Sequence, residues 1–264
     1  TTNGQDGAGN GFSLMGTFPT LTMNNGDYND NVGGHGIQLT GDGNNVATLT
    51  NVTATGNGID GLNATTLNTL TVSGGNYDTN IDDGIDASTI GTLDITDAAS
   101  ADTNGDDGIF ATGIGTLIVD GSSTAEMNTG DGLHGDNVAD GVIENSTFSM
   151  NGENGIRFAD VNSTEVTTNT IQNNGTSGTG DGVRVESGTD NPISQNVFGD
   201  NAGLAINLVG GTVELTSGVN SGATLNDKPS IITLVRTDTP GDMIAPSTSG
   251  ASETIRVHGE FADE

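Results

Sequence analysis

A two-residue step, glycine followed by an apolar residue, recurs along most of the chain, and Asp or Asn usually precedes it. We call this step the anchor. Its nine copies are Gly11-Phe12, Gly36-Ile37, Gly61-Leu62, Gly84-Ile85, Gly108-Ile109, Gly132-Leu133, Gly155-Ile156, Gly182-Val183 and Gly203-Leu204. Their apolar members lie 25, 25, 23, 24, 24, 23, 27 and 21 residues apart. A spacing that stays near 24 residues predicts a stack of repeats, each of which contacts only its neighbours.

Each repeat is predicted to contain about three short strands. Runs such as Thr69-Leu70-Thr71-Val72 alternate polar and apolar residues, and Gly, Asn, Asp or Thr interrupts almost every window long enough for a helix. A propeller blade would need ~40 or more residues per repeat, and collagen would need Gly at every third position. The sequence therefore predicts an all-β fold over residues 1–211, a single-stranded parallel β-helix (a solenoid) of about nine coils of ~24 residues.

A column of asparagines accompanies the anchors, because an Asn follows an apolar or small residue by three positions in successive repeats. The column is Asn57, Asn80, Asn104, Asn128, Asn151, Asn174 and Asn201, with Asn31 before it. An Asn at a turn can hydrogen-bond to the backbone and to the Asn of the next coil, while the apolar anchor residues point inward. Each coil then buries only a few side chains, which fits a chain with 31% hydrophobic residues.

The repeat resembles a known family. The chain is similar to right-handed parallel β-helix proteins of the pectate-lyase-like superfold over roughly residues 1–210. The steps Phe148-x-x-Asn151 and Phe198-x-x-Asn201, with the Gly-Gly-x-Gly-Ile run that ends at Ile37, resemble polymorphic outer-membrane autotransporter adhesin repeats, although most coils replace Phe by Tyr, Ala or Ile. The resemblance implies the right hand of the coil. It leaves the function open, because this fold hosts lyases, hydrolases, epimerases, tailspikes and adhesins.

The period fails after about Gly211. In residues 212–264, Ile231 to Val235 and Thr254 to Val257 are typical of strands, and a loop rich in Pro, Ser and Gly joins them. Repeat stacks need terminal caps that shield the open end. We therefore expect residues 212–264 to form a C-terminal β cap, and the alternative is the start of a further β segment.

The charge of the chain limits its partners. Five Lys and Arg residues against 35 Asp and Glu residues give a formal net charge of −30. This argues against nucleic acids and anionic membrane surfaces, both of which are bound by basic patches. No apolar run is long enough for a transmembrane helix, and the absence of cysteine excludes disulfides.

An acidic column is the strongest chemical feature. The residue before the anchor Gly is Asp60, Asp83, Asp107 and Asp131 in four successive coils. Coils ~4.8 Å apart would bring these carboxylates close together, where two unit charges repel by about 1 kcal/mol in water and more at a lower dielectric. Bound Ca²⁺ is one hypothesis, since it takes several carboxylate and carbonyl oxygens. The alternative is that Asp-Gly simply makes good turns. No organic cofactor is expected.

The sequence predicts no catalytic constellation. Arg157 and Arg184 directly follow anchors in successive coils, so they form either a basic spot for an acidic sugar or salt bridges to Asp160 or Glu186. The pairs that end at Asp83 and at Asp107 recur at one phase of the repeat, as turn residues would. The three histidines are His35, His134 and His258, and they look scattered.

A third class of function is ice binding, because a regular β-helix can present a flat array of threonines. Thr48, Thr69, Thr92 and Thr116 are expected to form one column, whereas the companion column of Thr50 and Thr71 continues as Asp94 and Ile118. One column of threonines is ordinary for strands, so the sequence does not favour ice binding.

The combined pattern predicts an extracellular or cell-surface structural or adhesive rod, a repeat segment of a larger surface protein. Its expected partners are other copies or segments of such a protein, carbohydrate, or the ends of further rods, with no nucleic acid and no membrane insertion. The alternative is a carbohydrate-active β-helix enzyme, a polysaccharide lyase or a glycoside hydrolase.

Overall fold

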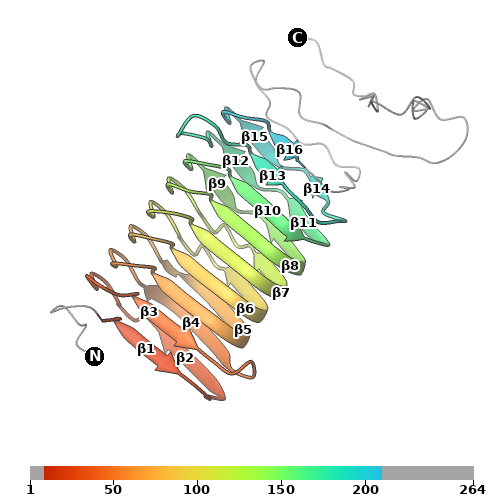
Figure 1. The fold of residues 1–264 in the computed structure, drawn as a ribbon. Helices are drawn as coiled ribbons and strands as arrows, with labels where there is room; N and C mark the ends of the chain where they lie inside the picture. The colour runs from red at the N-terminus through yellow and green to blue at the C-terminus, as the bar shows by residue number, and fades with distance from the viewer. Residues whose placement is uncertain (1–8, 210–264) are drawn as a thin grey trace, which may run out of the picture.

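The computed structural model describes residues 9–209, which wind as strands around one axis (Figure 1). The strands are β1 (Phe12–Met15), β2 (Thr20–Asn24), β3 (Ile37–Thr40), β4 (Val46–Thr53), β5 (Leu62–Asn76), β6 (Ile85–Thr96), β7 (Ile109–Val119), β8 (Leu133–Glu144), β9 (Thr147–Ser149), β10 (Ile156–Val161), β11 (Thr164–Thr167), β12 (Thr170–Gln172), β13 (Val183–Val185), β14 (Ile193–Ser194), β15 (Val197–Gly199) and β16 (Ile206–Leu208). Within these residues no helix could cross a membrane. The predicted cap, residues 212–264, lies outside the described residues.

The coils stack in parallel, as the sequence predicts. Nine strands follow one another along the first face in the order β1-β3-β5-β6-β7-β8-β10-β13-β16, which makes about eight turns. The anchor residues pair with one another from coil to coil, for example Leu62 with Ile85 and Ile85 with Ile109. The predicted parallel solenoid is therefore confirmed, with the anchors in register.

The last anchor was placed wrongly by the sequence pattern. Val183 pairs with Ile206, so the ninth anchor is Ala205-Ile206 and not Gly203-Leu204. Earlier anchors need Gly because the neighbouring coil leaves no room for a Cβ: at Gly84 it would lie 2.6 Å from the amide nitrogen of Asn104. The sequence pattern required a Gly at the anchor, whereas the register of the strands places Ala205 at this position.

Three corners shape each coil, and at these corners one or two residues have a positive φ. The first corner, directly before the Asn column, uses Asp30, Gly56, Thr79, Thr103, Met127, Met150, Asn173 and Asp200. The second uses Thr66, Thr89, Gly113, Asn137, Asp160 and Gly188. The third uses Asn25, Asn51, Gly74, Asp97, Gly121, Asn145, Thr168 and Gln195. Gly, Asn and Asp tolerate this conformation best, and they occupy most, but not all, of these corner positions.

The core is a set of columns that runs along the axis. The anchor residues Ile37, Leu62, Ile85, Ile109, Leu133, Ile156 and Val183 are each at most 1% exposed. Phe12, in the first described coil, is only half-buried. The core therefore lies inside the coil, and every outward side chain is available to line a surface site.

The expected threonine column forms only in part, because Thr69, Thr92 and Thr116 align whereas Thr48 does not. Thr48 pairs with Thr71, and Thr69 pairs with Val46. The reason is the turn between β3 and β4, which holds two more residues than the equivalent turn inside β5, so the alignment shifts by two. The true columns are interrupted by Val46 and by Asp94, and neither presents a continuous row of threonines.

Candidate functional site

The Asn column forms a hydrogen-bonded ladder. From Asn31 to Asn201, each Oδ1 after the first accepts the backbone N–H of the Asn in the preceding coil, and it also accepts that residue's Nδ2–H. Asn80 donates to Asn104 Oδ1 in this way at 2.9 Å from its backbone and 3.1 Å from its side chain. We call this the Asn ladder. Its side chains satisfy buried backbone groups, which would otherwise be costly.

The residues before the anchors form a second axial row, which we call the pre-anchor column. It comprises Asp60, Asp83, Asp107, Asp131, Asn154 and Asp181. Here Oδ1 of each residue accepts the backbone N–H of its counterpart in the following coil, at 2.6–3.2 Å. These side chains therefore point toward the C-terminal end, opposite to those of the Asn ladder. One oxygen of every carboxylate is used by the fold.

Burial of this column changes its acid–base properties. Burial, reinforced by the charges of Asp107 and Asp60, raises the pKa of Asp83 to about 9. Burial and the charge of Asp107 raise the pKa of Asp131 to about 6. Beside the column, burial and the charge of Asp60 raise the pKa of Asp86 to about 6. Asp83 therefore holds a proton at neutral pH that an ordinary aspartate would release, and Asp131 and Asp86 take up protons at a higher pH than an ordinary aspartate does.

Two histidines are not scattered, contrary to the sequence-based expectation. His35 Nδ1 lies 3.0 Å from Asp60 Oδ2, and His134 Nδ1 lies 3.1 Å from Asp107 Oδ2. Burial works to lower the pKa of His134, but the hydrogen bond and charge of Asp107 outweigh it and raise that pKa. The His134 ring also meets Phe110 edge to face, with the ring centroids 5.0 Å apart. A spacing of one coil plus three residues was the signal for the second pair.

Two groups of side chains could hold a cation. Ligand atoms of Asp107, Asp131 and His134 lie within 4.8 Å of one another, and so do those of Asp82, Asp83 and Asp106. A cation would be bound by the Oδ2 atoms of the column, because the Oδ1 atoms accept backbone hydrogen bonds. Asp60, the remaining member of the predicted metal set, lies next to His35 instead. Calcium binding at Asp60, Asp83, Asp107 and Asp131 stays a prediction.

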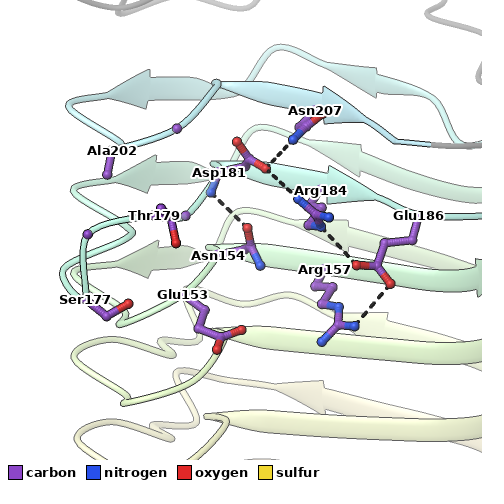
Figure 2. Close-up of a pocket in the computed structure, with 13 residues that line it drawn as sticks. Glu153, Asn154, Arg157, Ser177, Thr179, Asp181, Arg184, Glu186, Ala202 and Asn207 are labelled. Atoms are coloured by element: carbon purple, nitrogen blue, oxygen red, sulfur yellow. Dashed lines mark hydrogen bonds and ion pairs between the residues drawn. The ribbon is translucent and has the colours of Figure 1, made fainter.

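The two arginines share one acidic partner (Figure 2). Arg157 Nη2 lies 3.1 Å from Glu186 Oε2, and Arg184 Nε lies 2.9 Å from Glu186 Oε1. Asp181 Oδ2 lies 3.4 Å from Arg184 Nη1, and Asp131 Oδ2 lies 4.0 Å from Arg157 Nη1. Arg157 thus reaches the acidic column, which the sequence spacing did not suggest. Neighbouring carboxylates neutralise the charges of both guanidinium groups. This is the salt-bridge alternative of the sequence analysis, with Glu186 as the partner.

A pocket of about 570 Å³ opens beside these arginines. One wall is the turn from Ser177 to Gly180, and the floor is the outward face of β10, β13 and β16 (Figure 2). The turn exists because Asp181 follows Asn174 by seven positions, whereas Asn154 follows Asn151 by only three. We call the four extra residues, 175–178, the insertion. The pocket and the arginines therefore lie in the same pair of coils.

Comparison with known proteins identifies the repeat. A family model described as "Right handed beta helix region" matches residues 32–221. No curated protein matches the chain.

Two solved structures resemble the chain. The A-module of the mannuronan C-5 epimerase AlgE4 from Azotobacter vinelandii is 14% identical, with a TM-score of 0.26. The A-module of AlgE6 from the same organism is 12% identical, with a TM-score of 0.31. Each similarity covers 78% of this chain and 91% of the other.

Proposed function

Because this chain belongs to the family of right-handed β-helices, we propose that it serves as a structural and adhesive rod, a repeat segment of a larger extracellular or cell-surface protein. The observation that supports this function is the Asn ladder, which runs without interruption from Asn31 to Asn201. Its hydrogen bonds lie along the axis and join every coil to the next. A rod that carries load or holds a ligand at a distance needs such axial continuity.

The outward surface supports an adhesive role. It carries the histidines, arginines and carboxylates of the candidate site, while the stack itself is held together by the core and the ladders. Open strand edges favour pairing with another chain, and we include end-to-end association with further copies or segments among the proposed partners.

Surface labelling tests the proposed location. An antibody raised against the folded rod should label intact cells of the source organism, and permeabilisation should not increase the signal. Labelling that requires permeabilisation would contradict the proposal. The rod itself is tested by electron microscopy of the purified full-length protein, which should show a straight segment whose length scales with the number of coils. A compact particle would overturn it.

A second candidate function is carbohydrate chemistry, and one observation favours it. Asp107 orients the His134 ring, and Arg157 is the direct neighbour of His134 in the next coil. A carboxylate-oriented imidazole is a common general acid or base. Purified protein should then release oligosaccharides from a neutral or an acidic polysaccharide, and His134→Ala should abolish this release. No release from any of the polysaccharides tested would remove this candidate.

A further inference from the structure

We infer that the pocket beside the insertion binds an uncharged saccharide, with Arg157, Arg184, Asp181 and Glu186 as the groups that contact its hydroxyls. The inference rests on the adhesive part of the proposed function, for which it names the ligand class. Three features of the pocket carry it: a preformed wall, an alternating row of donors and acceptors, and a nearly balanced charge.

The insertion forms an ordered wall. The backbone N–H of Thr176 donates to Asn151 O at 3.1 Å, and that of Ser177 donates to Gly152 O at 3.2 Å. Gly178 N–H closes the turn on Gly175 O at 2.8 Å. These bonds tie the insertion to the preceding coil. The pocket is thus formed before a ligand arrives, which lowers the cost of ordering on binding.

The floor alternates acceptors and donors. Asn207 Nδ2 donates to Asp181 Oδ2 at 2.6 Å, and Arg184 links that carboxylate to Glu186. Arg157 extends the row on the other side of Glu186 (Figure 2). The side chains of Arg157, Arg184 and Glu186 remain about 30% exposed. A sugar hydroxyl both donates and accepts, so neighbouring hydroxyls can bridge a guanidinium and a carboxylate that the ion pairs already hold in place.

The charge of the pocket excludes other ligand classes. Two arginines face Glu153, Asp181 and Glu186, so the lining carries a formal charge of −1. An acidic sugar or a phosphate would find no unpaired guanidinium, and it would be repelled by a chain of net charge −30. Among the described residues that line the pocket, Ala202 has the only apolar side chain, so a hydrophobic ligand would gain little from them. An uncharged, hydroxyl-rich molecule avoids both penalties.

The side chain of Arg157 has one buried atom without a hydrogen-bond partner in the described part of the chain. Its Nε is buried and has no hydrogen-bond partner among the described residues. A buried donor without an acceptor is unfavourable, and such groups call for an explanation beyond packing. The guanidinium is held in this position by Glu186 and by the adjacent Asp131, with its Nη atoms directed to the two carboxylates. Since Nε itself is inaccessible, a ligand would contact the exposed remainder of the side chain, which is 31% exposed.

Ligand-observed NMR with defined sugars tests the inference. The probes are cellotriose, maltotriose, mannotriose and xylotriose, with trigalacturonate as the charged comparator. We expect saturation transfer and measurable calorimetric binding for at least one uncharged trisaccharide, and weaker or no binding of the uronate. Binding of the uronate alone, or of none of the five, would overturn the inference.

A matched deletion locates the site. Removal of residues 175–178 leaves Asn-Thr-Gly-Asp, which is the sequence of the natural turn Asn128-Thr129-Gly130-Asp131, so the variant should fold. Binding should fall at least tenfold in this variant and in Thr179→Trp, which fills the pocket and keeps the insertion. Thr112→Ala, on the same face in β7, should bind as the parent does. Unchanged binding in both pocket variants would overturn the inference, while the antibody and microscopy results on the rod would stand.

Discussion

Two columns of side chains run along the rod on either side of one turn, three residues apart in most coils, and they differ in one chemical respect. In the Asn ladder each amide after Asn31 both donates and accepts, so Asn80 donates to Asn104 and Asn104 donates to Asn128. In the pre-anchor column an ionised carboxylate can only accept. Asp83 Oδ1 accepts the backbone N–H of Asp107, and Oδ2 accepts no hydrogen bond from the described part of the chain. Neighbouring amide side chains hydrogen-bond to one another, whereas neighbouring carboxylates cannot.

Asn154 shows that the carboxylates exceed what the fold needs. Its Oδ1 accepts the backbone N–H of Asp181 at 2.8 Å, and its Nδ2 donates to Asp131 Oδ1 at 2.8 Å. An amide at a pre-anchor position therefore keeps the backbone bond and also relieves the neighbouring carboxylate. The comparison teaches that the turn requires an acceptor and not a charge, so the carboxyl groups of Asp83 and Asp107 are open to a role of their own.

The largest effect should follow from placing a carboxylate in the amide stack. Asn104→Asp puts an oxygen where Nδ2 now donates to Asn128 Oδ1 at 3.1 Å. A buried charge then faces an acceptor, although Asn80 still donates to the other carboxylate oxygen. We expect a loss of about 3–5 kcal/mol in the free energy of unfolding at pH 7, measured by chemical denaturation. Asn68→Asp, at an exposed position, is the control. Equal losses in the two variants would show that the ladder tolerates charge.

Calcium tests whether the acidic column binds a cation. If Asp60, Asp83, Asp107 and Asp131 form such a site, millimolar CaCl₂ should stabilise the rod by up to roughly 2.7 kcal/mol at a hundred times Kd. Sodium chloride of equal ionic strength should not reproduce this shift. Thermal unfolding of the parent and of Asp107→Asn measures it. Equal shifts from both salts, unchanged by the substitution, would reduce the column to a solvated turn.

Replacement of a carboxylate by an amide in the pre-anchor column should stabilise the protein. Burial holds the folded-state pKa of Asp83 near 9, and those of Asp86 and Asp131 near 6. Folded-state values above the unfolded ones mean that the folded chain binds more protons, so stability should fall as pH rises from about 4 through 6 to 9.

Asp83→Asn should remove the upper part of this fall and gain at least about 1.4 kcal/mol at pH 8, which is the worth of a single tenfold change in proton affinity. Denaturation curves from pH 4 to 9 measure the gain. Asp140→Asn removes one charge at an exposed position and should gain much less. The same gain from both substitutions would mean that only the net charge matters.

The smallest expected change in stability concerns the corner directly before the Asn ladder. It measures the cost of backbone strain at this corner, apart from the hydrogen bonds of the ladder. Thr103 has φ 60° there, whereas Gly56 occupies the equivalent position two coils earlier. The left-handed conformation costs an L-residue roughly 1–2 kcal/mol, partly offset by the greater freedom of Gly in the unfolded chain. Thr103→Gly should therefore raise the melting temperature by a few degrees. Thr112→Gly, inside β7, should lower it, and the opposite pattern would contradict the strain argument.

The fold was predictable because its determinants repeat. The anchors and the Asn column lie at fixed spacings, and a stacked coil brings equal positions together. Relationships between different columns were harder to predict. The contact of His134 with Asp107 combines one coil with a three-residue offset, and the threonine columns depend on two extra residues in the turn before Val46.

The pocket illustrates the same limit. The 27-residue spacing between Ile156 and Val183, with the long step from Asn174 to Asp181, reveals where residues are added, but not how they fold. The wall that Ser177 forms beside Arg157 follows from the backbone hydrogen bonds to the preceding coil. Sequence spacing therefore predicts which residues share a column, and the length of each turn decides which columns meet.

The insertion also bears on how such a protein can evolve. Ile156 still pairs with Val183, and Val183 with Ile206, although the chain takes a longer path between the first two. Extra residues at one corner thus leave the rest of the stack undisturbed. A lineage can acquire, lose or vary a surface loop in one coil without redesigning its interior. The coil that carries the loop then determines the position of that loop along the axis of the rod.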